Sequence, residues 1–159
     1  MWNTGCNNIF NGLDEGISIL DFEDQRLAIS VPAKGSANWK GVIFPWCSNA
    51  TEVRKKAFRV SSMQSGRMFL YLFQDYNTSR VCWSLASADP WSSRQVVRAD
   101  LQGDKTQTRF PDLDLYVVAP YVIGFPSDDE NDQFSQWEPK VLEAIGAVIS
   151  IVGVISAAL

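Results

Sequence analysis

The chain of 159 residues is long enough for one domain with a hydrophobic core and too short for two large domains. Hydrophobic residues make up 46% of the chain and charged residues 20%, which excludes a disordered chain and a protein with many membrane spans. Histidine is absent, so sites that need an imidazole base, a histidine-bound zinc or a histidine-bound haem are excluded.

The formal net charge of -4 comes mainly from one acidic segment. Six of the 18 acids lie in residues 127–143 beside one base, which leaves 12 acids and 13 bases for the rest of the chain. A nearly neutral body lacks the concentrated basic surface that phosphates require, so we expect no nucleic-acid partner. The densest cationic group predicts a solvated surface or, alternatively, a contact for anionic lipid, and consists of Arg54, Lys55, Lys56 and Arg59.

Residues 17–125 predict short β-strands separated by turn residues. The expected strands cover residues 17–22, 26–31, 39–46, 57–63, 68–76, 80–86, 95–101 and 113–125, the last interrupted at Pro120. Residues 68–76 are almost all apolar or aromatic, which predicts a strand that is buried on both faces. Within residues 17–125, no ten-residue stretch has the period of a helix. The sequence therefore predicts an all-β domain over residues 1–126, formed as an antiparallel sandwich or from blade-like hairpins.

A weak internal repeat favours the blade-like form. Phe22-Glu23-Asp24 corresponds to Phe73-Gln74-Asp75, and Trp39 corresponds to Trp91. Each copy consists of a hairpin, a loop and a tryptophan, and a period near fifty residues is typical of a four-stranded propeller blade.

Residues 61–91, which contain Phe69-Leu-Tyr-Leu-Phe-Gln-Asp75 and Trp91, resemble a blade of the fucose-binding propeller lectins, and residues 17–39 resemble a second copy. The resemblance implies a propeller-like fold whose ring closes only when chains assemble. That family binds the sugar with an arginine on the second strand of the blade and a glutamate on the third. Leu70 and Cys82 stand at these positions here, so the resemblance does not imply a fucose site.

A different glycan site is predicted by the tryptophans at strand ends and in loops, which are Trp39, Trp46, Trp83 and Trp91. An indole ring can stack on a sugar ring while its N–H group donates a hydrogen bond. Trp83 and Trp91 are the candidate glycan-binding residues on this interpretation. The alternative is that these rings fill the hydrophobic core.

The strongest sequence signal is the C-terminal segment, residues 144–159, which contains sixteen residues and no charge. As a helix it would be about 24 Å long, and the apolar residues just before it bring it close to membrane-spanning length. Small residues line one face at spacings of four, three and four, and larger aliphatic residues lie opposite. The small residues are Gly146, Ser150, Gly153 and Ala157, and the larger ones include Ile145, Ile149 and Val152.

Trp137 and Lys140 precede this segment, where an interfacial anchor would lie. We therefore expect a hydrophobic C-terminal helix over residues 139–159, joined to the β-domain by an acidic linker over residues 127–138. The helix could insert into a membrane or pair with a copy of itself. The alternatives are a helix docked on its own β-domain, and a Val- and Ile-rich strand that packs between subunits.

Candidate chemistry is sparse elsewhere. Asp112 and Asp114 lie on one face of an expected strand and could hold a divalent cation or act on a glycoside, but exposed acids on an edge strand are the more ordinary interpretation. The three cysteines lack the spacing of metal ligands. We expect no metal site, no cofactor and no enzymatic activity.

The N-terminal residues lack the charged and apolar regions of a signal peptide, so we expect cytoplasmic synthesis, with association with membranes afterwards. The first functional hypothesis is a non-enzymatic β-domain that associates with membranes or self-assembles as a homo-oligomer through its C-terminal helix. A lectin-like glycan-binding module and an assembly protein whose tail packs between subunits are the alternatives.

Overall fold

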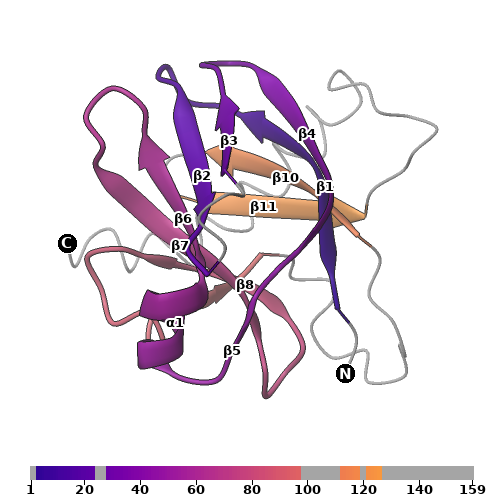
Figure 1. Ribbon diagram of the computed structural model, residues 1–159, viewed down its shortest axis with the longest axis vertical. Helices are drawn as coiled ribbons and strands as arrows, with labels where there is room; N and C mark the ends of the chain where they lie inside the picture. The colour runs from indigo at the N-terminus through magenta and orange to yellow at the C-terminus, as the bar shows by residue number, and fades with distance from the viewer. Residues whose placement is uncertain (1–2, 24–27, 98–111, 119–120, 127–159) are drawn as a thin grey trace. The chain divides into compact units, whose positions relative to one another are not determined.

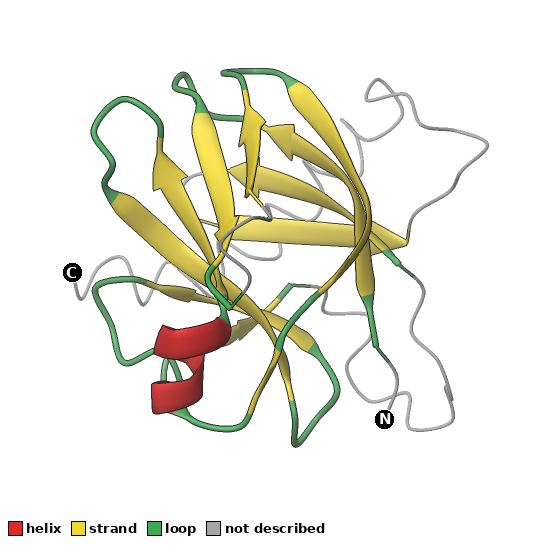
Figure 2. Cartoon of the chain, in the orientation of Figure 1, coloured by secondary structure: helices red, strands yellow, loops and turns green. Residues whose placement is uncertain are grey.

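The computed structural model describes residues 3–23, 28–97, 112–118 and 121–126. The chain divides into two units, residues 1–127 and 128–159, and every described residue lies in the first unit. The linker expected over residues 127–138 and the helix expected over residues 139–159 therefore lie outside the described residues. The described part consists of β-strands and one short helix, which confirms the all-β prediction for this unit (Figure 2).

Two sheets form the unit (Figure 1). The smaller sheet has the strand order β11-β10-β1-β4, and the larger has the order β3-β2-β6-β7-β8-β9 with β5 beside β7. Neighbouring strands are antiparallel except for the parallel pairs β1 with β10 and β5 with β7. The strands are β1 (Gly5–Asn11), β2 (Ile17–Asp21), β3 (Ala28–Val31), β4 (Ser36–Ile43), β5 (Trp46–Cys47), β6 (Phe58–Ser62), β7 (Met68–Asp75), β8 (Val81–Leu85), β9 (Gln95–Val96), β10 (Leu113–Val118) and β11 (Tyr121–Pro126).

The register of the larger sheet places its apolar side chains in rows. Residues directly opposite each other in an antiparallel pair share a face, so Phe58, Leu72 and Trp83 form one row across β6, β7 and β8. All three are buried. Trp39 of β4 contacts Phe58 with a ring-centroid distance of 4.9 Å, which brings side chains of both sheets into one core.

Helix α1 (Ala50–Lys56) covers the other face of the larger sheet near its β5 edge. Val53 and Ala57 pack there with Tyr71, Phe73 and Cys82 in a second apolar cluster. Tyr71 and Phe73 alternate along β7 with Leu70 and Leu72, which belong to the opposite face. The prediction that residues 68–76 form a strand buried on both faces is therefore confirmed. Only the first two residues of β7, Met68 and Phe69, are partly exposed.

The sequence interpretation missed α1 because the helix has only seven residues, too few to show a helical period. The local signals were present. Asn49 lies at the N-cap and its side chain accepts a hydrogen bond from the Glu52 amide at 2.9 Å, while basic residues occupy the last turn. This arrangement satisfies a free amide at the start of the helix and complements the helix dipole.

The hairpins of the internal repeat do not form separate blades. The β2–β3 and β7–β8 hairpins belong to the same sheet, with β6 between them, whereas each propeller blade is a sheet of its own. Trp39, the counterpart of Trp91 in the repeat, lies in β4 of the other sheet. The described unit therefore consists of two sheets that share a core, the smaller one with mixed strand direction.

Removing a large side chain from either face of β7 should destabilise the unit. We expect Leu72→Ala and Phe73→Ala each to lower the free energy of unfolding by about 2–5 kcal/mol, because both side chains are fully buried. Met63→Ala is the matched control, since Met63 is 54% exposed, and should change it by less than about 0.5 kcal/mol. Urea unfolding followed by fluorescence measures all three, and a negligible cost for Phe73→Ala would contradict burial beneath α1.

Candidate functional site

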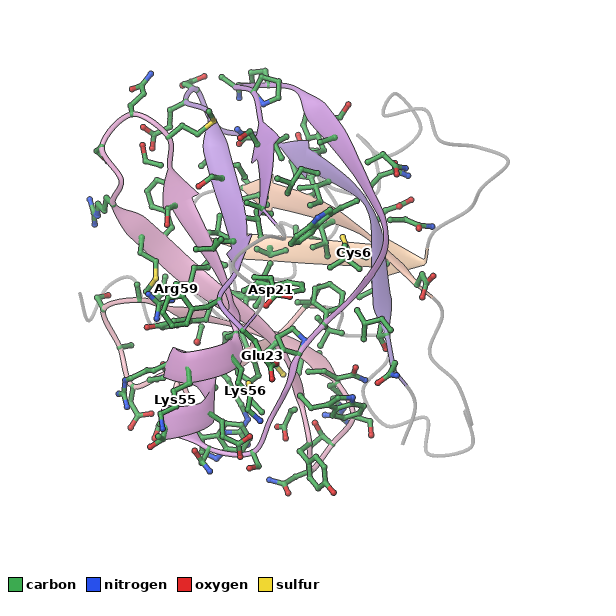
Figure 3. The ribbon with its side chains drawn as sticks, viewed as in Figure 1. Cys6, Asp21, Glu23, Lys55, Lys56 and Arg59 are labelled. Carbon is green, nitrogen blue, oxygen red and sulfur yellow. The ribbon has the colours of Figure 1, made fainter. Side chains whose placement is uncertain are left out.

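The four predicted cationic residues divide into two pairs. Lys56 donates to the Glu52 carboxylate at 2.9 Å, and Arg59 donates to the main-chain oxygen of Arg54 at 2.8 Å while its guanidinium lies 3.7 Å from the Phe22 ring centroid. Figure 3 shows Lys55 and Lys56 on α1 and Arg59 beside the helix. Lys56 and Arg59 therefore stabilise α1, the latter by holding the carbonyl end of the helix.

Arg54 and Lys55 are the exposed members of this group. Lys56 is partly shielded, and its hydrogen bond to Glu52 raises its pKa. The pKa of Glu52 is lowered, first by the hydrogen bond that it accepts from Ser48 and then by Lys56. The surface available to an anionic partner is thus a pair of cations rather than the predicted cluster of four.

Trp83 is in the wrong place for the predicted glycan site. Its side chain is 3% exposed and lies opposite Leu72 on the core face of the larger sheet. A sugar ring cannot reach an indole face between two packed sheets, so the expectation of a surface Trp83 is corrected. The alternative interpretation, that the ring fills the core, is confirmed for this residue.

Trp91 is partly exposed, but neighbours already cover its ring. The Arg94 guanidinium lies 4.1 Å from the ring centroid, and the Phe73 ring stacks against it at 6.2 Å. Arg94 also pairs with the buried Asp75 carboxylate at 2.9 Å and donates to the main-chain oxygen of Trp91. The group fixes the segment between β8 and β9 against β7, which is a structural role.

An exposed aromatic group lies at the end of β7, and the sequence interpretation included its tryptophan, Trp46, but missed its tyrosine, Tyr76. Tyr76 is 51% exposed, and the partly exposed Trp46 ring meets it edge to face with a centroid distance of 6.0 Å. The Trp46 indole N–H donates to the Asn3 side-chain oxygen at 2.7 Å. The available signal was an aromatic residue immediately before the Asn77-Thr78-Ser79 turn, where side chains tend to face solvent.

Asp112 and Asp114 serve the backbone instead of forming an open carboxylate pair. Asp112 accepts from the Gly5 amide at 3.0 Å, and Asp114 accepts from the main-chain and side-chain amides of Asn8 at 3.0 and 3.1 Å. These bonds span the irregular register between β1 and β10, where ladder bonds are interrupted. The expectation of exposed acids on an edge strand is corrected, because β10 lies between β1 and β11 and Asp114 is buried.

The three cysteines are buried free thiols. Burial raises the pKa of Cys47 and of Cys82 to about 12 from an ordinary value of 9.0, with smaller contributions from Glu52 at Cys47 and from Asp75 at Cys82. Burial also raises the pKa of Cys6, and the charges of Asp114 and Asp112 add to it. Thiols held in this protonated form are poor nucleophiles and poor metal ligands.

The tail residues of the predicted site lie outside the described residues. They are Trp137, Lys140, Ile145, Gly146, Ile149, Ser150, Val152, Gly153 and Ala157. Among the residues that the structure does describe, there is no helix of the length and apolar character needed to cross a membrane. Within the same residues, no three potential metal ligands come together.

Comparison with known proteins provides no family assignment. A scan against protein-family models and searches of curated proteins and of solved structures gave no match.

The buried thiols predict a loss of stability at alkaline pH. A thiol whose pKa is raised on folding stabilises the native state fully below pH 9, the unfolded value, and this stabilisation is lost as pH rises toward about 12. In this window each such thiol should lower the free energy of unfolding by about 1.4 kcal/mol per pH unit. Urea unfolding between pH 8 and 11 measures the slope. It should flatten in Cys47→Ala and Cys82→Ala, and an unchanged slope in both variants would contradict the assignment.

Proposed function

We propose that this protein is a non-enzymatic β-domain that associates with membranes, or with copies of itself, through the apolar segment over residues 144–159. The observation that carries the proposal is the composition of that segment. It has eight large aliphatic side chains and no charge. Each of these side chains gains about 1.5–3 kcal/mol when it is fully buried, so leaving the segment in water is strongly unfavourable.

The division of the chain supports this proposal. The described strands and α1 form a unit whose large apolar side chains come from residues before 127, and the apolar segment belongs to the second unit. Acidic residues predominate between residue 127 and the apolar segment. An apolar segment attached through such a charged stretch to a β-domain is a suitable arrangement for an anchor or an assembly element.

The charge of the β-domain adds a preference among lipids. Arg54 and Lys55 are exposed on α1 and take part in none of the ion pairs found among the described residues, and the Arg54 charge acts weakly on the Asp89 carboxylate. A cation near an anionic bilayer contributes about 1 kcal/mol. We therefore propose lipid as the first partner of the segment, with a secondary preference for anionic headgroups.

Flotation with lipid vesicles tests the proposal. The full chain should float with vesicles of phosphatidylcholine and phosphatidylserine, while a chain ending at Glu138 should remain at the bottom. In the full chain, Ile149→Lys with Val152→Lys should abolish flotation, because a charge in the hydrocarbon region is costly. Equal flotation of the full and shortened chains would overturn the proposal.

Further variants separate the effects of added charge, of the exposed cations on α1 and of the small residues in the apolar segment. Thr51→Lys with Met63→Lys adds the same charge at exposed positions of the β-domain and should leave flotation intact. Arg54→Gln with Lys55→Gln should weaken binding to anionic vesicles roughly 5- to 30-fold and leave binding to neutral vesicles unaffected.

Gly146→Leu with Gly153→Leu should reduce the oligomer size measured by sedimentation, since close approach of two helices needs small residues.

A further inference from the structure

The described surface contains one exposed aromatic group, on an uncharged turn that buried polar groups hold in place. Three large hydrophobic side chains among the described residues are about half exposed, and Tyr76 is the aromatic one. It follows β7 directly and pairs edge to face with Trp46 of β5. We infer that Tyr76 and Trp46, with the amides of Asn77 and Asn3, form a binding site for a neutral saccharide.

The turn that carries Tyr76 is fixed by buried polar groups. The fully buried Gln74 side chain donates to the Ser79 main-chain oxygen at 2.8 Å and accepts from the Thr4 amide at 3.1 Å. The buried Asp75 carboxylate accepts from the Asn77 amide at 2.8 Å. These bonds hold the turn and the N-terminal segment in place beside each other, so little ordering is needed when a ligand binds.

The main chain of the turn is equally constrained. The Tyr76 amide donates to the main-chain oxygen of Cys47 in β5 at 2.9 Å, and the Ser79 amide donates to the main-chain oxygen of Asp75 at 2.7 Å. Ser79 has a φ of 61°, an uncommon conformation for this residue type that the surrounding bonds maintain. Tyr76, Asn77 and Thr78 nevertheless remain exposed at the tip. A rigid turn with exposed side chains is a suitable platform for recognition.

The chemistry of the exposed groups selects the ligand class. An aromatic face packs on the C–H face of a sugar ring, and primary amides and a hydroxyl pair with sugar hydroxyls as both donors and acceptors. Within the described residues the Asn77 side chain has no hydrogen-bond partner, and Asn3 is exposed while it orients Trp46. The residues of the turn tip, Tyr76 to Ser79, carry no charge, and the Asp75 charge beneath them is buried and paired with Arg94. The site therefore fits a neutral ring with hydroxyl groups.

A glycan array of neutral mono- and oligosaccharides tests the inference with the full chain. At least one neutral saccharide should bind, and titration calorimetry with it should show at least a tenfold loss of affinity in Tyr76→Ala. Tyr76→Phe keeps the ring and should retain most of the affinity. Asn77→Ala should reduce affinity several-fold, because it removes hydrogen bonds and leaves the ring in place.

Met63→Ala is the matched control, since it removes a similarly exposed side chain from another loop and should leave binding unchanged. Circular dichroism checks that each variant is folded, which is expected because Tyr76 and Asn77 are exposed. An array without any neutral-saccharide signal would overturn the inference, as would binding that Tyr76→Ala leaves intact. Truncation at Glu138 leaves this site in place, so the result is independent of the outcome of vesicle flotation.

Discussion

Strand β7 is buried on both faces, and the rest of the described structure depends on this constraint. Leu70 and Leu72 face the core between the sheets, while Tyr71 and Phe73 face the cluster beneath α1. The strand ends in two buried polar residues: Gln74 bonds the N-terminal segment and the Ser79 oxygen, and Asp75 bonds Arg94 and the Asn77 amide. The same strand therefore positions both cores and the exposed Tyr76 turn, so packing and surface chemistry are coupled through one element.

Local composition was sufficient to predict the elements whose neighbours are close in the chain. The apolar run in residues 68–76 predicted β7, and Pro120 predicted the break between β10 and β11. Strand β1 was missed, because its Gly and Asn residues are typical of turns and its parallel partner β10 is distant, with Asn8 and Asp114 106 residues apart. The short helix α1 was missed for a different reason. Its capping signals are local in the sequence, but seven residues are too few to show a helical period.

The exposure of the candidate site residues was also hard to predict, because it depends on how the strands and α1 pack. A tryptophan in a β-rich sequence can face a core or solvent, and only the register opposite Leu72 places Trp83 inside. Four neighbouring cations look equivalent in sequence, yet Glu52 and the end of α1 engage two of them and leave Arg54 and Lys55 exposed. Tyr76 has a local turn signal, but its pairing with Trp46 of β5 joins residues distant in the chain and could not be predicted from the sequence.

We propose separate roles for the two units: the β-domain buries its own apolar side chains on both faces of β7, and lipid covers the apolar segment over residues 144–159. Hydrogen exchange of the full chain with and without anionic vesicles tests this division most directly. We expect the amides of β7 to exchange most slowly and at the same rate in both conditions, while vesicles slow the amides of residues 144–159. Amides of residues 144–159 that are already slow in the lipid-free monomer, and unchanged by vesicles, would contradict it.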